Sequence, residues 1–548
     1  MEELVNRSII GARGWRRWTT LFVWPASVVG FLVAVAPITA QDLPRAVDEF
    51  WAAESIAEVE EAISTVLALK PGIESLWPLV RAGISYDGDV PLGRQLVTRS
   101  NADGVEYRYL VYIPDDYDPG RRYPLRVYLH GGVSRPRRDE ADWWRNQDRY
   151  TRSDSIVVFP EAWGDAMWWQ ANQIENLAGV LNDLKRDYNI NENLVHLLGV
   201  SDGATGVFYH AFKAPTPWAG FLSFNGHPVV LANPATGADG QMYVTNLRNK
   251  PFFVINGGQD RLYPVNSVVP FFQLFVDAGV YLDFQPKPES GHNMEWWDEE
   301  SANIDAFVVG QGRQPLPDRV VWETESTERF NRAHWVVITE LGDVSGQNSF
   351  DDFNEITPPG ARVPLGFNRL GQLDSGAGIL LIDIMVGSIA ESAGVSAGDV
   401  LVGVNNIPVA TVDDLRAAIQ TPRETPGLSI RIERDGQPLS FVLTPPDRST
   451  MPPSRQAFPR ALMSGRVQLL RNGNEIRVAT RGVQAYKLLL SPEQFDFTAP
   501  IKVITNDVES FEGIVEPNPR ILLDWAARDR DRTMLFGAEL EVRVGVQN

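Results

Sequence analysis

Residues 195–212 read VHLLGVSDGATGVFYHAF. The apolar run Val195–Leu198 indicates a buried strand, and Ala204–Phe212 has helical character. Between them, glycines on both sides of Val200-Ser201-Asp202 leave room for a sharp strand-to-helix turn in which the serine adopts unusual backbone angles. This context predicts that the Ser201 hydroxyl stands out at the end of a sheet strand, where it is a candidate nucleophile.

The chain contains the same Gly-x-Ser-x-Gly pattern a second time, around Ser396 in Gly394–Gly398. That copy leads into a Gly-Asp step, Gly398-Asp399, at the start of a later strand. A turn at this place explains both glycines. We therefore interpret Ser396 as structural and Ser201 as the functional serine.

Strands and helices alternate on both sides of Ser201. Apolar runs at Leu125–Leu129, Ile156–Phe159 and Phe252–Ile255 indicate further buried strands, and Asn176–Tyr188 indicates a helix. Buried strands separated by helices predict an α/β fold, with a mainly parallel sheet and helices on both faces. We place this domain at residues 101–312.

A serine hydroxyl is a weak nucleophile at neutral pH and needs a base beside it. Among the six histidines of the chain, His292 lies in a late loop after the strand-like run Tyr281–Gln285. Asp260 directly follows the strand Phe252–Ile255, where an acid that orients the imidazole would be expected. We predict that His292 is the general base of Ser201 and that Asp260 orients it.

The negative charge that develops on an attacked carbonyl oxygen needs preorganised N–H donors. The backbone N–H of Asp202, at the start of the helix, is one predicted donor. The loop after Leu125–Leu129 reads His130-Gly131-Gly132-Val133, and its glycines permit close approach. The second donor comes from Gly131, Gly132 or Val133, and the sequence leaves these three open.

Several segments besides the Ser201 turn carry a family resemblance: Tyr109–Pro114, His130–Gly132, Pro160–Trp163, Gly258–Asp260 and Gly291–Asn293. Together, residues 106–310 resemble the α/β-hydrolase superfamily. They are most similar to its secreted esterase branch, which contains polyhydroxybutyrate-depolymerase-like and feruloyl-esterase-like enzymes. The resemblance implies a Ser201–Asp260–His292 triad that cleaves carboxylic esters through an acyl-enzyme, with no cofactor and no metal.

One departure from the family concerns cysteine. Depolymerase relatives often carry disulfides and a cysteine in the oxyanion loop, whereas this chain has no cysteine. The resemblance therefore does not single out a polymer, and the implied substrate is a small-molecule or polymer-derived ester. Two alternatives stay open: a serine peptidase of prolyl-oligopeptidase-like type, and a non-catalytic envelope scaffold built on a hydrolase fold.

Seven tryptophans flank the loops of this predicted site. They either form aromatic walls for an aryl or acyl group or pack the core, and the sequence leaves both interpretations open. The seven are Trp143, Trp144, Trp163, Trp168, Trp169, Trp296 and Trp297.

Residues 361–450 form a different unit. The strand Gly378–Met385 is followed by Gly387-Ser388-Ile389-Ala390 and then by Gly398–Asn405, an order that resembles a PDZ domain. In that family Leu365-Gly366-Phe367 would form the loop that holds a peptide's C-terminal carboxylate, which implies a peptide C-terminus as a partner. Pro364 stands where a glycine is more usual and has no N–H to donate, so intramolecular docking is the alternative use of this unit.

The segments on both sides of this unit have a β pattern. Alternating apolar residues mark Val320–Ile338, and Arg471–Asn474 is a strong hairpin turn. We predict one β-sandwich-like domain from residues 318–360 and 455–548, with the PDZ-like unit inserted in it; two separate small β units are the alternative. Helical spacing before the α/β domain predicts a helical hairpin within residues 41–100.

The N-terminus and the composition indicate the compartment. Residues 1–40 contain arginines, a long apolar run and a small residue before a polar start, which is typical of a secretory signal peptide. An uncleaved membrane anchor is the alternative. We therefore expect an exported, periplasmic or extracellular protein, with membrane contact only if this segment remains. A net charge of −20 argues against nucleic acid as a partner.

Overall fold

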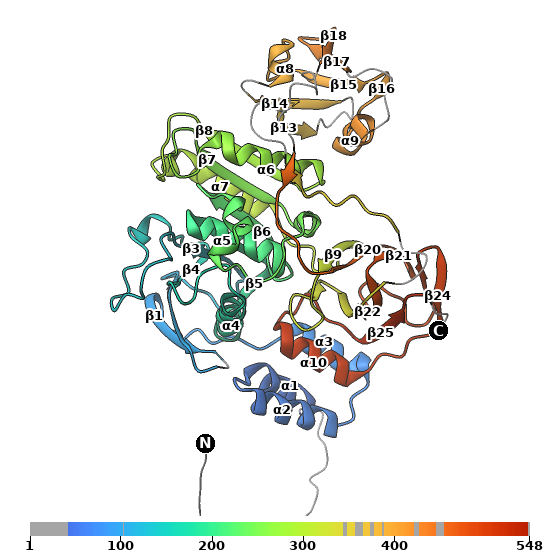
Figure 1. The fold of residues 1–548 in the computed structure, drawn as a ribbon. Helices are drawn as coiled ribbons and strands as arrows, with labels where there is room; N and C mark the ends of the chain where they lie inside the picture. Colours follow the sequence, from blue (N-terminus) through green and yellow to red (C-terminus); the bar gives the residue numbers. More distant parts are fainter. Residues whose placement is uncertain are drawn as a thin grey trace, which may run out of the picture.

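The computed structural model describes residues 42–101, 103–343, 348–356, 365–372, 378–385, 388–420, 427–444 and 454–545. Among these, eight strands form the large sheet at the centre of the α/β domain, in the order β1-β2-β4-β3-β5-β6-β7-β8 (Figure 1). Their bounds are β1 Gly93–Ser100, β2 Glu106–Ile113, β3 Tyr123–Leu129, β4 Ile156–Pro160, β5 Ile190–Val200, β6 Gly220–Phe224, β7 Phe252–Gly257 and β8 Leu282–Lys287.

The pairing in this sheet changes from antiparallel to parallel. Strands β1 and β2, and β2 and β4, pair antiparallel. From β4 through β3, β5, β6 and β7 to β8, all neighbours are parallel. Parallel strands buried on both faces consist of continuous apolar runs, which is why β3, β4, β5 and β7 could be predicted from the sequence; β6 was not predicted.

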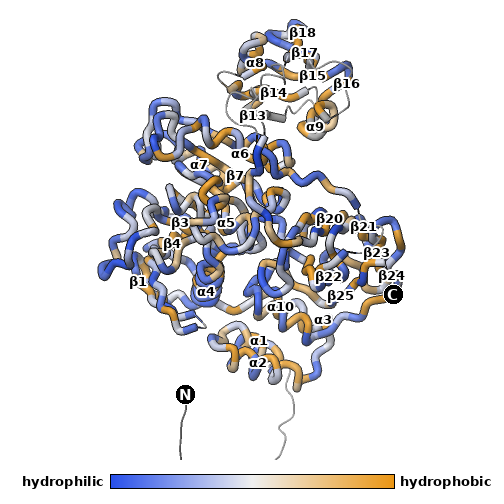
Figure 2. Tube along the Cα trace, in the orientation of Figure 1, coloured by the Kyte–Doolittle hydropathy of each residue, from blue (hydrophilic) through white to orange (hydrophobic). Residues whose placement is uncertain are grey.

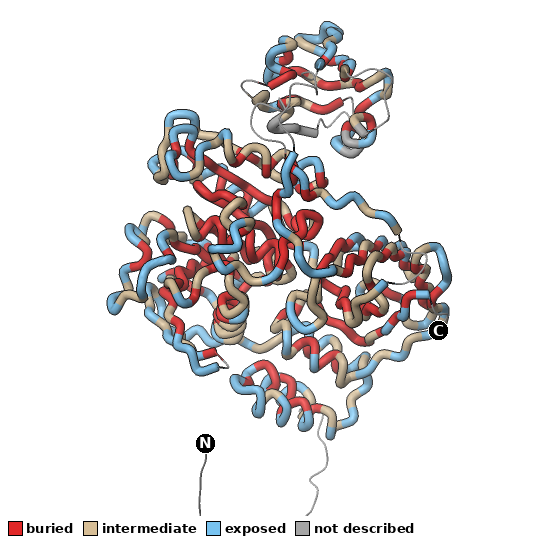
Figure 3. The backbone as a smooth tube through the Cα atoms, in the orientation of Figure 1, coloured by how far each residue is buried: buried red, intermediate tan, exposed pale blue. Residues whose placement is uncertain are grey.

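Helices cover both faces of the sheet. Helices α4 (Ala171–Asp187), α5 (Asp202–Lys213) and α6 (Val265–Asp277) contribute to one buried apolar cluster, and α7 (Trp297–Gly310) to another. Successive strand residues alternate between the two clusters: in β6, Phe221 lies in the first and Leu222 in the second. Figures 2 and 3 show these strands as apolar and buried. The predicted α/β fold with helices on both faces is confirmed.

The structure differs from the predicted helical hairpin at residues 41–100. Three helices are present, α1 (Asp42–Ala52), α2 (Ile56–Ala68) and α3 (Ile73–Ala82), and β1 already belongs to the large sheet. The sheet therefore begins before residue 101. Strand β1 is half-exposed at the sheet edge, with Leu96 facing solvent, so it has little apolar pattern to reveal it.

Further sheets follow the α/β domain. One has the order β24-β23-β21-β20-β9 and the other β10-β11-β22-β25, and both contribute to a single apolar core. Because β9 pairs with β20 and β11 with β22, the segments before and after the inserted unit form one structure. The bounds are β9 Arg319–Thr324, β10 Arg332–Ala333, β11 Val336–Leu341, β20 Gly465–Asn472, β21 Glu475–Arg481, β22 Val483–Leu490, β23 Ile501–Thr505, β24 Val508–Gly513 and β25 Ala538–Arg543.

A separate lobe contains the inserted unit (Figure 1). Its sheet runs β13-β14-β15-β17-β18 with β16 paired to β15, and it has its own apolar core. The bounds are β13 Phe367–Gln372, β14 Ile379–Ile384, α8 Ile389–Ser392, β15 Val400–Val404, β16 Ile407–Pro408, α9 Val412–Gln420, β17 Leu428–Arg434 and β18 Gln437–Leu443.

A short antiparallel stem of β12 (Glu355–Ile356) and β19 (Arg455–Gln456) brackets this lobe. Ile356 and the residues after the stem, Ala457 and Phe458, are buried in the apolar core of the α/β domain. The lobe is thus attached through two chain segments that the α/β domain buries.

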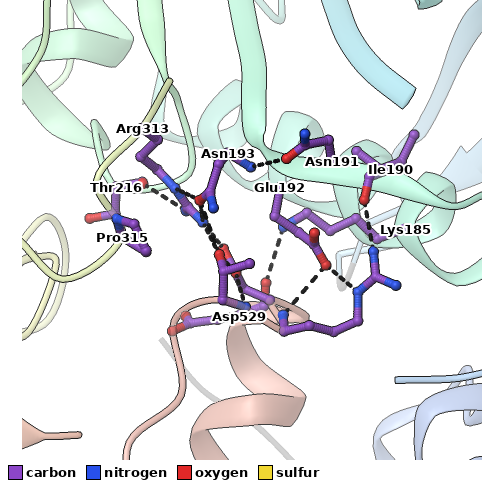
Figure 4. Close-up of polar contacts among 12 residues, drawn as sticks. Lys185, Ile190, Asn191, Glu192, Asn193, Thr216, Arg313, Pro315 and Asp529 are labelled. Carbon is purple, nitrogen blue, oxygen red and sulfur yellow. Dashed lines mark hydrogen bonds and ion pairs between the residues drawn. The ribbon is translucent and has the colours of Figure 1, made fainter. Parts of the chain in front are cut away.

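The C-terminal helix α10 (Pro519–Asp529) packs against the N-terminal helices α1 to α3. A buried polar network also ties the segment after α10 to the α/β domain (Figure 4). Arg313 donates to Asp531 at 2.6 Å and to Asn193, and Arg532 forms an ion pair with Glu192. Burial alone would raise the pKa of Asp531, but the charges of Arg313 and Lys185 hold that pKa well below its usual value. The network fixes the C-terminal domain on the sheet.

None of the helices that the structure describes is both long and apolar enough to cross a membrane. The predicted signal peptide or anchor, residues 1–40, lies outside the described residues.

Candidate active site

Ser201 stands at the junction of β5 and α5, with φ 57° and ψ −119°. Its two flanking glycines are required: a Cβ on Gly199 would collide with the Gly203 carbonyl, and a Cβ on Gly203 with the Leu129 carbonyl. A non-glycine residue in such a region costs about 1–3 kcal/mol and persists only where its surroundings enforce it. The Ser201 N–H donates to the Phe224 carbonyl at 2.9 Å, which fixes this turn against β6.

His292 and Asp260 lie beside Ser201. The Nε2 atom of His292 is 2.9 Å from the Ser201 Oγ, and its Nδ1 atom is 2.6 Å from Asp260 Oδ2. A carboxylate only accepts hydrogen bonds, so His292 Nδ1 carries the proton and Nε2 offers its lone pair to the serine hydroxyl. The structure therefore brings together the three side chains that the sequence analysis singled out.

Asp260 is held rigidly. Its side chain is buried, and its other oxygen, Oδ1, accepts the backbone N–H groups of Leu262 at 2.8 Å and Tyr263 at 2.9 Å. With Oδ1 held by two backbone donors, Oδ2 is directed at His292. This arrangement fixes the orientation of the imidazole ring.

Gly131 lies directly against the serine. A Cβ on Gly131 would stand 2.8 Å from the Ser201 Cβ and 3.4 Å from its Oγ. The Val133 N–H donates to the Asp202 carboxylate at 2.9 Å, so Val133 is not available as an oxyanion donor. Within the part of the chain that the structure describes, the N–H groups of Gly131, Gly132 and Asp202 have no hydrogen-bond acceptor. Gly131 and Gly132 thus remain the candidates for the second donor.

His130 shapes the same loop. Its Nδ1 lies 2.9 Å from the Gly131 carbonyl and its Nε2 accepts the Ala162 N–H at 3.1 Å, which together define one neutral tautomer. Burial lowers the pKa of His130, in agreement with a neutral ring. The Trp168 indole donates to the His130 carbonyl at 2.8 Å. The loop is anchored through its carbonyls, which leaves N–H groups free beside Ser201.

The remaining histidines are buried in other settings. Burial lowers the pKa of His196 and of His210 to about 3, and burial holds the pKa of His334 well below its usual value. Among the described residues, His292 alone contacts the Ser201 hydroxyl. The seven tryptophans flanking the site are all buried, most of them in the two apolar clusters of the sheet, so packing accounts for them.

Two residues of the site, Asn225 and Tyr263, and the side-chain contact of a third, Asp202, were not predicted from the sequence. Asn225, at φ 50°, accepts the Gly257 N–H at 3.0 Å and donates to the Asn293 carbonyl at 2.6 Å, so it joins β7 to the His292 loop. The Tyr263 ring lies 5.6 Å from the His292 ring and 5.8 Å from the His227 ring, centroid to centroid. The carboxylate of Asp202 is the third. A strand followed by Asn-Gly was the only sequence signal for Asn225.

Burial shifts the pKa values of Tyr263 and His227. Burial, together with the charges of Asp202 and Asp260, raises the pKa of Tyr263 to about 12. Burial and the charge of Arg455 lower the pKa of His227 to about 4. Tyr263 therefore stays a neutral phenol beside His292, and His227 a neutral imidazole on the other side of its contact with Tyr263.

The loop predicted to hold a peptide carboxylate in the inserted unit lies at the edge of a described range. Leu365, Gly366 and Phe367 are described, whereas Pro364 lies outside the described residues. Gly366 has φ 96°, and a Cβ there would collide with Ser388, so this position requires glycine. Phe367 begins β13, which lies at the edge of its sheet.

Ser396, the serine of the second Gly-x-Ser-x-Gly pattern, lies in a turn of the inserted unit. The Ser396 N–H donates to the Asp399 carboxylate at 2.8 Å in a turn before β15, as its structural interpretation requires. In the described ranges, no group of three acidic or histidine side chains is close enough to hold a metal ion.

A family model described as "PDZ domain" matches residues 382–427. A curated relative, "Serine protease HTR4" of Bos taurus, is 30% identical over 91 residues, which span 15% of this chain and 18% of that protein. The match thus covers less than a fifth of either chain.

Solved structures similar to this chain include a thermostable esterase, at 18% identity and a TM-score of 0.33 over 40% of this chain and 63% of that chain. A putative dipeptidyl aminopeptidase IV from Bacteroides ovatus is 17% identical, with a TM-score of 0.34 over 41% of this chain and 37% of that one. Esterase 2 of Thermogutta terrifontis is 13% identical, with a TM-score of 0.33 over 40% of this chain and 95% of that chain.

The large sheet is mainly parallel with helices on both faces, as the sequence predicted, and the serine turn follows its strand β5. The family model supplies the identity of the inserted unit. Residues 382–427 match a PDZ domain, and the chain joins this unit to an α/β domain in which the Ser201 turn follows β5.

Proposed function

We propose that this protein is an exported serine hydrolase that cleaves carboxylic esters through an acyl-enzyme on Ser201. The observation that carries the proposal is the continuous hydrogen-bonded series from Asp260 through His292 to the Ser201 hydroxyl, at 2.6 Å and 2.9 Å. Nucleophile, base and orienting acid in this geometry are the elements of serine acyl transfer.

In this mechanism, His292 Nε2 takes the proton of the Ser201 hydroxyl as Oγ bonds to the ester carbonyl carbon. Asp260 stabilises the imidazolium that results. The carbonyl oxygen becomes an oxyanion, which accepts hydrogen bonds from the Asp202 N–H and from Gly131 or Gly132. The intermediate collapses, the C–O bond to the alcohol breaks, and His292 returns its proton to the leaving alkoxide. Water, activated by His292, then attacks the acyl-enzyme and releases the acid and free Ser201.

A labelling experiment tests the nucleophile. A fluorophosphonate probe should label the wild-type protein, and the label should vanish in Ser201→Ala. Ser396→Ala is the matched control, because Ser396 lies in the same sequence pattern but in a turn of the PDZ domain; this variant should label like wild type. Absence of labelling in the wild type would leave only a non-catalytic scaffold.

The ester preference rests on the resemblance of residues 106–310 to secreted esterases. A panel of nitrophenyl esters and aminoacyl amides tests it. Efficient ester turnover with little amide cleavage supports the proposal. Efficient amide cleavage with poor ester turnover would support the alternative, a serine peptidase of prolyl-oligopeptidase-like type.

One observation favours the peptidase alternative. The PDZ domain, a fold that binds peptide C-termini in other proteins, is joined to the α/β domain through a stem whose ends are buried beside α6. Helix α6 itself begins shortly after Asp260 of the proposed triad. A peptide held by Leu365, Gly366 and Phe367 would thus be bound by a unit whose stem contacts the helix that follows Asp260. Isothermal titration with C-terminally free and amidated peptides tests whether this loop binds a carboxylate.

Export is proposed from residues 1–40. Mass spectrometry of the protein recovered from the periplasm or medium tests it: a mature form starting near Gln41 supports a cleaved signal peptide. Recovery of the full-length chain in the membrane fraction would instead support an anchor.

A further inference from the structure

The carboxylate of Asp202 spans from the start of α5 to the loop after β3. Its Oδ2 accepts the Val133 N–H at 2.9 Å, across 69 positions of sequence. Asp202 is also the first residue of α5, and its own N–H is the predicted oxyanion donor next to Ser201. One residue thus supplies a predicted donor through its backbone and contacts the loop of the other candidate donors through its side chain.

The loop needs such a contact because of its composition. Gly131 and Gly132 have no side chains to pack, Gly132 adopts φ +71°, and glycine has the largest conformational freedom of any residue. On the N-terminal side, the Trp168 indole holds the His130 carbonyl and His130 holds the Gly131 carbonyl. On the C-terminal side, among the described residues, the bond from Val133 to Asp202 is the hydrogen bond that holds the loop to the nucleophile turn.

We propose that the Asp202 side chain is a positioning residue for the oxyanion hole, a role that rests on the proposed function of Ser201. By accepting the Val133 N–H, the carboxylate fixes the Gly131–Gly132 amides at one distance from the Asp202 amide. Asp202 then supplies one donor of the oxyanion hole with its own backbone N–H. It positions the other donor, in Gly131–Gly132, through the hydrogen bond that its side chain accepts from Val133.

The hydrogen bond that Asp202 accepts from Val133 can be separated by mutation from the negative charge of the Asp202 carboxylate. Accepting an N–H requires an oxygen at this position but no negative charge, and a carboxylate close to a developing oxyanion would repel it. An asparagine oxygen in the same place would keep the hydrogen bond and remove the repulsion. Asp202→Asn should therefore preserve turnover, whereas Asp202→Ala should not.

The experiment compares wild type, Asp202→Ala and Asp202→Asn with a nitrophenyl ester. Asp202→Ala should lower kcat about 10- to 100-fold, as expected for displaced oxyanion donors, with KM changed less than about threefold. Its Ki for a trifluoromethyl ketone, which forms an oxyanion adduct, should rise by a similar factor. A residue with a merely structural role would not link the Ki of the adduct to kcat in this way.

Asp202→Asn should lie within about threefold of wild type in kcat and in Ki. Asp239→Ala is the control: Asp239 accepts the Ala171 N–H at 2.7 Å across 68 positions, a similar bond that involves none of the proposed site residues, and its loss should leave kcat unchanged. If Asp202→Ala does not fold, as judged by thermal unfolding, Asp202→Ser replaces it, because a serine side chain is too short to reach Val133.

Two results would overturn the proposal: wild-type kcat and Ki in Asp202→Ala or its replacement, or an Asp202→Asn variant as impaired as Asp202→Ala. Both leave the proposed function intact, because the wild-type protein is still active. A wild-type protein that neither turns over esters nor reacts with a fluorophosphonate would remove the proposed function, and the positioning role with it.

Discussion

Phe458 and Phe271 pack ring against ring with their centroids 5.7 Å apart, although Phe458 follows the stem of the PDZ domain and Phe271 lies on α6 of the α/β domain. Phe458 is completely buried and also packs against Phe212 of α5. The segment that returns from the PDZ domain therefore forms part of the core that supports the candidate active site.

Removal of the Phe458 ring should destabilise the α/β domain. We expect Phe458→Ala to lower the free energy of unfolding by about 3–5 kcal/mol, because it leaves a cavity among aromatic rings. Urea unfolding followed by tryptophan fluorescence measures this change. Leu462→Ala is the control, since Leu462 is 62% exposed and only four residues further along. Equal midpoints for the two variants would contradict the assignment of Phe458 to the core of the α/β domain.

The proposed triad predicts large losses of turnover. Asp260→Asn and His292→Ala should each lower kcat by about 10⁴-fold, because the first disturbs the tautomer of the imidazole and the second removes the base. Steady-state kinetics with a nitrophenyl ester checks both. His227→Ala serves for comparison, since His227 contacts Val229 and Tyr263 but not Ser201. Wild-type turnover in Asp260→Asn or in His292→Ala would show that another residue fills that role.

The nucleophile turn should not tolerate a methyl group. A Cβ at Gly203 would collide with the Leu129 backbone, which cannot move without displacing β3. We expect Gly203→Ala to abolish fluorophosphonate labelling and to lower the yield of folded protein. At Gly310, by contrast, no atom lies within 4 Å of an added Cβ. Gly310→Ala should therefore label and fold like wild type, and the same behaviour in Gly203→Ala would refute the close packing of this turn.

Buried histidines predict a loss of stability in acid. Burial lowers the pKa of His210 to about 3, whereas in the unfolded chain it is near 6.5. The unfolded state therefore binds the proton first as the pH falls, and stability decreases between about pH 6.5 and pH 3. At pH 4 this one group costs about 3 kcal/mol relative to neutral pH.

Thermal unfolding of wild type and His210→Leu at a series of pH values measures this effect. The slope of stability against pH should be shallower in His210→Leu, because one protonation has been removed. Parallel curves for the two proteins would show that His210 does not titrate on unfolding.

The sequence predicted β3, β4, β5 and β7 because they are continuous apolar runs, and it predicted the PDZ domain from the order of its strands and glycine-marked turns, but it missed β6. It did not reveal β1, whose residues alternate between half-buried and exposed and so carry little apolar signal. The position of Ser201 follows from local signals on both sides of it. The links from Asn225 to the His292 loop and from Asp202 to Val133 could not be predicted, because they join residues 68 and 69 positions apart.

The choice among oxyanion donors shows the same limit. Gly131, Gly132 and Val133 are equivalent candidates in the sequence, since each is a backbone N–H in one loop. Only the bond from the Val133 N–H to Asp202 distinguishes them. Which of the three N–H groups is already hydrogen-bonded depends on how α5 lies relative to the loop after β3. No pattern within either segment encodes that arrangement.

The pairing of β9 with β20 has a consequence for synthesis of the protein. The apolar strand Arg319–Thr324 leaves the ribosome long before its partner Gly465–Asn472, and the whole PDZ domain is made between them. The PDZ domain has its own core and can fold during this interval, while the edge of β9 that pairs with β20 has no partner strand. The interval in which the nascent β9 lacks its partner strand therefore falls after the large α/β sheet has been synthesised and before Gly465 emerges.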